Sequence, residues 1–161
     1  MPLKKLKLSF SYFSLLPLLA FVAILGLDRW TKDWALSWPE GHIINIAPYV
    51  DFLLVKNRGI AFGLLADTDI NFLIISLISL VLLYLVFRFF LPSFPLWPFV
   101  LIASGALGNI IDRWMYGFVV DFIKVHQFYV FNVADAAITI GSAILIFQLL
   151  FKKTFHESPQ G

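Results

Sequence analysis

Four long apolar stretches, separated by shorter polar segments, dominate the hydropathy pattern of the 161-residue chain. The first runs without a charge from residue 8 to residue 27, and its apolar character continues to Ala35. A helix needs roughly 20 mainly apolar residues to cross about 30 Å of hydrocarbon, and each stretch is close to that length. Three prolines between residues 92 and 98 mark a turn between the second and third stretches. The pattern predicts four membrane-spanning helices, at about residues 10–35, 70–88, 96–112 and 132–151.

The first apolar stretch has an alternative interpretation as a cleaved signal peptide, because Lys4, Lys5 and Lys7 precede it. It contains no small-x-small cleavage site, however, and it is long for the apolar core of a signal peptide. The apolar pattern also continues past Asp28. We therefore expect a retained spanning helix.

Residues 36–69 differ in kind from the apolar stretches. Short β-prone runs at 42–46 and 49–55 alternate there with glycine, proline and polar residues. This pattern predicts a small sheet resting at the membrane surface. The predicted fold class is an all-α membrane protein, with residues 1–161 forming one integral domain. It is a four-transmembrane-helix bundle with a small extracytoplasmic β-sheet cradle.

Composition agrees with the bilayer as the solvent of this chain. Sixty per cent of the residues are hydrophobic and 14% are charged, and the mean hydropathy is +0.88, which excludes a soluble domain. The absence of cysteine excludes disulfides, thiolate metal sites and cysteine nucleophiles. The three histidines are scattered without ligand spacing, so we expect no metal or other cofactor. The net charge of +2 gives no indication of nucleic-acid binding.

Basic residues orient the predicted bundle. With a cytoplasmic N-terminus, six lysines and arginines fall on each side of the membrane. The inner six are concentrated in short segments and include the lysines before the first helix, whereas the outer six are spread over long segments. We therefore expect both termini to be cytoplasmic.

Polar residues that are costly in a bilayer collect at the outer face under this topology. They are Asp28, Lys32, Asn57, Asn109, Asp112, Arg113, Asp121, Asn132 and Asp135. An ionised carboxylate at a helix centre costs about 2.5 to 3.5 kcal/mol on insertion scales, so several at one depth indicate a functional site. Asp28 and Lys32 are four residues apart, and an internal ion pair explains them as well as a direct role at that site does. Close helix packing better explains the small residues Ser104, Gly105 and Gly108.

Carboxylates are the remaining candidates for catalysis. No histidine lies within a predicted span to serve as the base for a serine nucleophile. Two neighbouring aspartates that share one proton can hydrolyse an amide, because one activates a water while the other protonates the carbonyl oxygen.

The choice of the pair lies among three aspartates. Asp112 adjoins Arg113 at a helix end, which favours a permanently ionised carboxylate. Asp121 lies between apolar neighbours that would raise its pKa, and Asp135 opens a helix that can hold it in place. We favour Asp121 with Asp135, and Asp112 stays an alternative to Asp121.

Four segments, taken in order along the chain, resemble motifs of the lipoprotein signal peptidases, also called signal peptidase II. They are residues 28–32 (DRWTK), 57–62 (NRGIAF), 105–113 (GALGNIIDR) with 119–122 (VVDF), and 131–135 (FNVAD). Any one of them is weak, but the set is specific and extends from the first helix to the last. The one departure is Ile60, where a small residue is common in the family.

The resemblance implies a bacterial four-span aspartyl endopeptidase that removes the signal peptide from prolipoproteins, before a cysteine carrying diacylglycerol. By motif position, Asp121 and Asp135 correspond to the catalytic pair. Supporting or substrate-binding roles fall to Asn57, Asn109, Arg113, Asn132, Asp112, Asp28 and Lys32. The family's sheet cradle and mobile outer-loop helix would lie at about residues 38–66 and 114–130.

The implied location is the bacterial inner membrane, with the active site near the outer face. The expected partners are diacylated prolipoprotein substrates and membrane lipid, without nucleic acid, and we expect a monomer. Two other classes stay open: a small carrier or proton relay, and a structural assembly subunit. The first would show an inverted repeat with charges near the midplane, and neither feature is visible.

Overall fold

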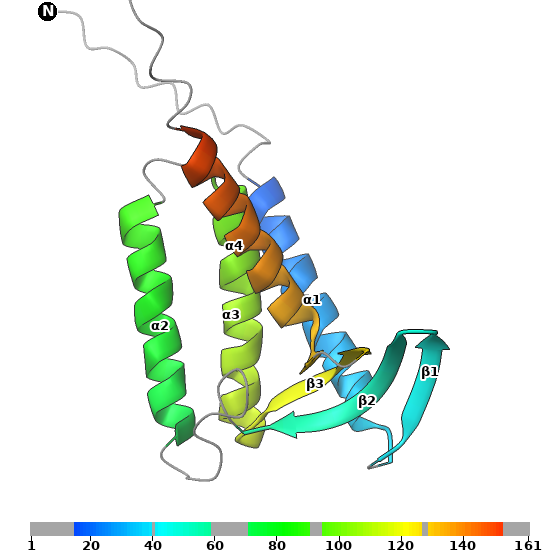
Figure 1. Ribbon diagram of the computed structural model, residues 1–161. Coiled ribbons are helices and arrows are strands. Elements are labelled where there is room, and N and C mark those ends of the chain that lie inside the picture. Colours follow the sequence, from blue (N-terminus) through cyan, green and yellow to red (C-terminus); the bar gives the residue numbers. More distant parts are fainter. Residues whose placement is uncertain (1–14, 40, 59–70, 91–94, 127–128, 153–161) are drawn as a thin grey trace, which may run out of the picture.

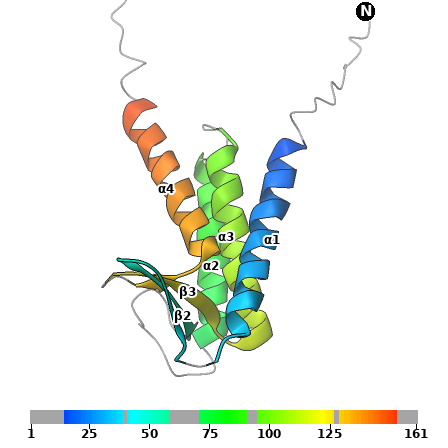
Figure 2. The same cartoon turned by 90° about the vertical axis from the view of Figure 1, so that its right-hand side faces the viewer.

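The computed structural model describes residues 15–39, 41–58, 71–90, 95–126 and 129–152, and within them lie four helices and four strands. The helices are α1 (Leu16–Leu36), α2 (Asn71–Phe90), α3 (Trp97–Tyr116) and α4 (Val133–Lys152). The strands are β1 (Ile43–Ala47), β2 (Val50–Asn57), β3 (Val119–Val125) and β4 (Val130–Phe131). The helices run side by side, and the sheet lies at one end of the bundle (Figure 1). The first turn of α1 and the last turn of α4 lie at the opposite end (Figure 2).

Proline and glycine define helix ends in this chain. Pro17 and Pro98 stand within the first two positions of α1 and α3, where the missing N–H breaks no bond within the helix. Helix α3 ends at Tyr116 and is capped by Gly117, whose φ of 76° is left-handed. Its N–H donates to the carbonyl oxygen of Arg113 at 3.0 Å. The chain therefore leaves the helix at Gly117 and turns directly into β3.

The four strands form one antiparallel sheet in the order β1-β2-β3-β4. The pairing of β2 with β3 extends from Val50 opposite Val125 to Asn57 opposite Val119. Asp121 lies opposite Val55 in this register. The sheet therefore brings Asn57, at the end of β2, close to Asp121.

The expected outer-loop helix over residues 114–130 is wrong. Helix α3 continues to Tyr116, and residues 119–125 form β3. That segment contains three valines together with isoleucine and phenylalanine, which favour a strand. The sheet was expected over residues 38–66, and two of its strands, β1 and β2, lie in that range. The other two, β3 and β4, come from the later part of the chain. Residues 59–66 of that expectation lie outside the described residues.

Helix α3 is the centre of the bundle and packs against α1, α2 and α4. Glycines leave no room for a side chain at its contact with α4, as expected for Gly105. A Cβ atom on Gly105 would overlap the carbonyl oxygen of Ala134, and one on Gly141 would lie 2.7 Å from that of Pro98. Gly108 has a different partner, because a Cβ there would lie 2.5 Å from Oδ2 of Asp28.

Apolar side chains cover the outside of the helices, whereas several charged side chains are buried. Leu82 and Phe147 are 57% and 60% exposed, but Asp28 is 1% exposed. Among the described helices, only α4 is both long enough and apolar enough, over Val133–Phe151, to be a candidate membrane span by these two criteria. Helix α2 carries a shorter apolar segment, Ser76–Phe90.

Candidate active site

Asp121 and Asp135 line the same cavity, which has a volume of about 280 Å³. Asp121 is on β3 and is 2% exposed. Asp135 is in the first turn of α4. Asn57, Asn109 and Arg113 also line this cavity, so five of the residues expected at the site are brought together from β2, α3, β3 and α4.

Asn132 connects the two aspartates. Its Nδ2 donates to Oδ1 of Asp121 at 2.7 Å, and its backbone N–H donates to Oδ2 of Asp135 at 3.3 Å. The side-chain oxygen of Asn132 in turn accepts the backbone N–H of Asp135 at 2.8 Å, which caps the start of α4. Because Asn132 is fully buried, these bonds hold both carboxylates in a fixed relation.

Two further asparagines complete the contacts of the carboxylate oxygens. Asn57 donates from Nδ2 to Oδ2 of Asp121 at 2.9 Å, and Asn109 donates from Nδ2 to Oδ1 of Asp135 at 2.7 Å. Each of the four carboxylate oxygens thus accepts a hydrogen bond from a neutral amide. Among the described residues, neither carboxylate forms an ion pair.

This environment raises the pKa of Asp121 to about 7. Burial is the main cause, and the negative charge of Asp135 adds to it. Hydrogen bonds from Asn57 and Asn132 and the charge of Lys32 act in the opposite direction. Asp121 therefore keeps its proton at neutral pH to an extent that an exposed aspartate does not.

A buried cluster of charges lies between α1 and α3, next to the cavity residue Asn109. Nζ of Lys32 is 2.8 Å from Oδ2 of Asp28 and 2.9 Å from Oδ2 of Asp112. All three side chains are at most 1% exposed. The structure therefore contains the ion pair between Asp28 and Lys32, which is one of the two explanations that their spacing in the sequence allowed.

The charge cluster contacts the aspartate site through Asn109. Lys32 donates from Nζ to Oδ1 of Asn109 at 3.0 Å, and Nδ2 of Asn132 approaches the same oxygen at 3.2 Å. With its oxygen held by two donors, the amide of Asn109 must direct its NH₂ group toward Asp135. Asp28 contributes separately, because its Oδ1 accepts the backbone N–H of Ala134 at 2.8 Å beside Asp135.

Asp112 has different neighbours from those expected. The cations on its carboxylate are Lys32 and Arg29, whose Nη1 is 2.5 Å from Oδ1, and not the adjacent Arg113. Its Oδ2 also accepts the backbone N–H of Val120, at 3.0 Å, and so fixes the strand residue before Asp121. Arg113 instead donates to the carbonyl oxygen of Asn109 at 3.3 Å and lines the cavity.

Sequence reasoning missed two residues near this site. Arg29 pairs with a residue 83 positions away, and only its spacing of four from Asp33 signals an ion-pairing role. Tyr129 lines the cavity from the segment before β4, and no pattern in the sequence distinguishes it.

The arrangement is suited to acid–base chemistry. It holds two carboxylates in one cavity, one of them with a raised pKa, and an arginine that can bind a carbonyl or carboxylate oxygen. Within the described part of the chain, no group of three or more histidine, cysteine, aspartate or glutamate side chains is placed to hold a metal ion.

Comparison with known proteins agrees with this chemistry. Residues 20–151 match the model of the family described as signal peptidase (SPase) II, Peptidase_A8. The lipoprotein signal peptidase of Thermodesulfovibrio yellowstonii is 38% identical, and the match covers 94% of this chain and 100% of that protein. The lipoprotein signal peptidase of Caldanaerobacter subterraneus is 39% identical over 84% of this chain and 94% of that protein.

Solved structures show the same fold. A bacterial membrane enzyme solved at 2.3 Å resolution is similar with a TM-score of 0.74 and 32% identity, over 90% of this chain and 93% of that one. A second, solved at 1.9 Å, has a TM-score of 0.68 and 34% identity, over 84% of this chain and 92% of that one. The chain belongs to the lipoprotein signal peptidase (signal peptidase II) family of aspartic peptidases.

Proposed function

We propose that this lipoprotein signal peptidase cleaves its prolipoprotein substrates before a diacylglyceryl-modified cysteine, using Asp121 and Asp135 to activate water. The processing of prolipoproteins is the activity of the family. One observation carries the residue assignment: Asn132 hydrogen-bonds both carboxylates, and both line one cavity. Asp112 is the weaker alternative, because two cations and a backbone N–H already occupy its carboxylate.

The two aspartates take different roles in this proposal. Asp121, with its raised pKa, carries the shared proton and donates it to the oxygen of the scissile carbonyl. Asp135 accepts a proton from the attacking water, so that the oxygen of water bonds to the carbonyl carbon. The proton held by Asp135 then passes to the leaving nitrogen as the C–N bond breaks. Asp121 takes back a proton from the hydroxyl group of the tetrahedral intermediate, and the carbonyl bond forms again.

The surrounding polar residues hold this pair. Asn57, Asn109 and Asn132 donate to the carboxylates without neutralising them, which keeps the exchange of one proton possible. Arg113 lines the cavity and supplies a cation for a backbone carbonyl of the substrate. Asp28, Lys32 and Asp112 act as supporting residues through Asn109, Ala134 and Val120.

The proposed topology places all four helices across the bacterial inner membrane, with both termini in the cytoplasm. The exposed apolar side chains of the helices support it, since a bilayer covers such surfaces. Three charged side chains of α1 and α3, Asp28, Lys32 and Asp112, are buried within the protein and paired with one another, which lowers their cost in a span. The sheet and the aspartate cavity then lie near the outer face, where a lipid-anchored precursor presents its cleavage site.

Substrate lipidation provides the test of this function. We expect the purified protein to cleave a precursor peptide carrying a diacylglyceryl cysteine, and to cleave the same peptide without lipid at least about 100-fold more slowly. Both cleavage rates are measured by mass spectrometry of the released signal peptide. Equal rates on the two peptides would contradict the proposed substrate.

The pH dependence follows from the raised pKa of Asp121. As the pH rises through about 7, Asp121 loses the proton that it must donate, and the charges of the two aspartates repel each other. We expect kcat/KM to fall by about tenfold per pH unit well above that value. Rates on a precursor without titratable groups near the cleavage site, measured between about pH 6 and pH 9, provide the check. A flat profile over this range would show that Asp121 is not the proton donor.

A further inference from the structure

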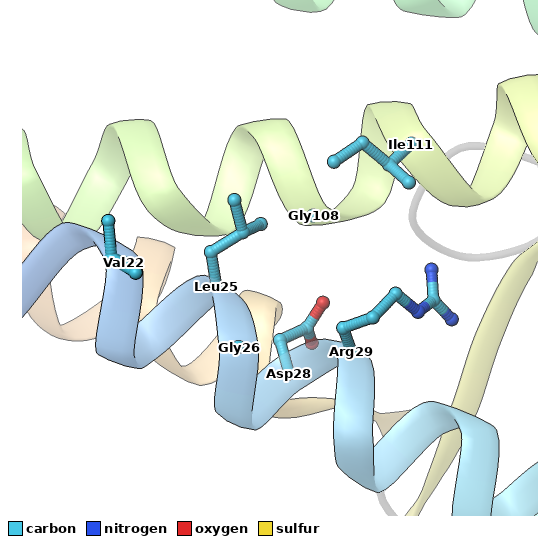
Figure 3. A pocket seen from close by; sticks show the side chains of 7 residues that line it. All are labelled: Val22, Leu25, Gly26, Asp28, Arg29, Gly108 and Ile111. Atoms are coloured by element: carbon cyan, nitrogen blue, oxygen red, sulfur yellow. The ribbon is translucent and has the colours of Figure 1, made fainter.

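A second groove lies between α1 and α3 (Figure 3). Its residues from α3, Gly108 and Ile111, are not among those that line the aspartate cavity. Its volume is about 310 Å³. Apolar side chains and two glycines form most of its walls: Val22, Leu25 and Gly26 from α1, and Gly108 and Ile111 from α3. Asp28 and Arg29 lie at one end and Val22 at the other, so the groove is polar only toward the sheet (Figure 3).

Gly26 leaves this groove open. A Cβ atom built on Gly26 would have no other atom within 4 Å, so the glycine does not serve a close helix contact. This distinguishes it from Gly108, where the space is taken by the carboxylate of Asp28. Glycine in the middle of a helix costs about 1 kcal/mol relative to alanine, and no contact within the protein compensates for it at Gly26.

Arg29 gives the groove a cationic end with an unused donor. Its Nη1 bonds Asp112, and its Nε lies 3.3 Å from Oδ1 of Asp33. Its Nη2 and its Nε, although buried, make no hydrogen bond with any of the residues that the structure describes, so the contact of Nε with Asp33 is an ion pair only. A buried guanidinium N–H without a partner is costly, so an acceptor supplied by a ligand at this end would be bound favourably.

Asp33 adds a negative charge beside this cation. Its side chain is 57% exposed, so it can meet a second charge from outside the protein. Val22, Gly26, Arg29 and Asp33 follow the spacing of one helix face, with the two charges at one end of an apolar strip. The rise from Val22 to Arg29 is about 10 Å, which suits the upper part of an acyl chain.

We propose that this groove binds one glycerophospholipid with a zwitterionic, amine-bearing head group. The acyl chain lies along Gly26, the phosphate contacts Arg29, and the ammonium group contacts Asp33. A phosphoethanolamine head group matches the pair of opposite charges, whereas a purely anionic head group would bring a second negative charge close to the carboxylate of Asp33 without a cation to offset it. The site is separate from the proposed dyad, so its test does not depend on catalysis.

Native mass spectrometry and thermal unfolding of the full-length protein in detergent test this site. We expect one phosphatidylethanolamine to bind at least about tenfold more tightly than phosphatidylglycerol, and to raise the unfolding temperature. Gly26→Leu fills the groove where space is open, and should weaken phosphatidylethanolamine binding by about tenfold or more. Precursor cleavage in detergent should stay within about twofold of the wild-type rate, because Gly26 contacts none of the polar residues around the aspartates.

Two more variants separate the groove from general lipid contact. Ala23→Leu adds the same side chain at an exposed position of α1 outside the groove, and should leave binding unchanged. Asp33→Asn should abolish the preference for phosphatidylethanolamine over phosphatidylglycerol. The proposal is overturned by equal binding to wild type and Gly26→Leu, by equal loss in Ala23→Leu, or by tighter binding of phosphatidylglycerol to the wild type.

Discussion

Asp121→Asn and Asp135→Asn should each reduce cleavage of a lipidated precursor by about 10³-fold or more while the protein stays folded. Asparagine keeps the size and shape of aspartate, although its NH₂ group replaces one of the two oxygens that accept hydrogen bonds from neighbouring amides. It can neither take up the proton of the water nor give one to the carbonyl oxygen. The loss should appear in kcat, because both groups act on the reacting atoms. The measurement is single-turnover cleavage of the diacylated precursor.

Stability of the same variants separates chemistry from folding. Because the folded-state pKa of Asp121 is above its unfolded value, ionising this group costs folding stability as the pH rises from about 4 through about 7. Asp121→Asn removes this cost but also loses one accepting oxygen, so it should stay folded at neutral pH with an unfolding temperature close to that of wild type. Asp51→Asn, on the neighbouring strand β2, provides the matched control and should cleave normally. Wild-type cleavage by either active-site variant would remove that residue from the proposed dyad.

Lys32→Met should destabilise the protein more than any other single change discussed above. The lysine is fully buried and its Nζ contacts Asp28, Asp112 and Asn109. Removing one partner of a buried ion pair leaves an uncompensated charge and costs about 3 to 5 kcal/mol. We expect a large drop in the unfolding temperature, measured with the protein in detergent, and a poor yield of folded protein.

A double variant identifies the cause of that loss. Lys32→Met combined with Asp28→Asn removes both charges of the pair, and should recover part of the stability that Lys32→Met loses. Cleavage by the double variant should stay low, because Asn109 no longer has the lysine that directs its NH₂ group toward Asp135. Lys56→Met, at an exposed lysine of β2, should change neither property. A Lys32→Met protein as stable as wild type would contradict the role of this charge cluster.

Helix positions were well predicted from the sequence because apolar length, proline and charge limit them strongly. The fourth helix was expected at about 132–151 and is observed at Val133–Lys152, and the second at about 70–88 against Asn71–Phe90. The third continues beyond its expected end at 112, because Asp112 and Arg113 are part of its last turns and Gly117 ends it. A charge in the sequence was mistaken there for a helix end.

Strands β3 and β4 were harder to predict. Residues 119–125 form a short apolar run around Asp121, and such a run is compatible with either a strand or a helix. The register with β2 decides the outcome, and it depends on residues more than 60 positions apart. Because Asn57 reaches Asp121 only through this register, its hydrogen bond was not predictable from local sequence.

The residue types of the candidate site were predictable from the sequence. The hydrogen bonds and ion pairs that join these residues were not. Elimination of other nucleophiles left carboxylates, and their sequence neighbours favoured Asp121 with Asp135 over Asp112. The structure places the favoured two in one cavity. The double contact of Asn132 and the pairing of Arg29 with Asp112 join distant parts of the chain, which spacing along one helix does not reveal. The catalytic assignment itself stays a prediction.

Infrared spectroscopy of the carboxyl groups tests most directly whether Asp121 and Asp135 hold one proton between them. The spectrum is recorded as the pH is raised through about 7, for the wild type and for Asp121→Asn. We predict a protonated carboxyl band in the wild type that titrates near this pH and is missing from Asp121→Asn. A wild-type spectrum without such a band, or a band unchanged in Asp121→Asn, would contradict the shared proton.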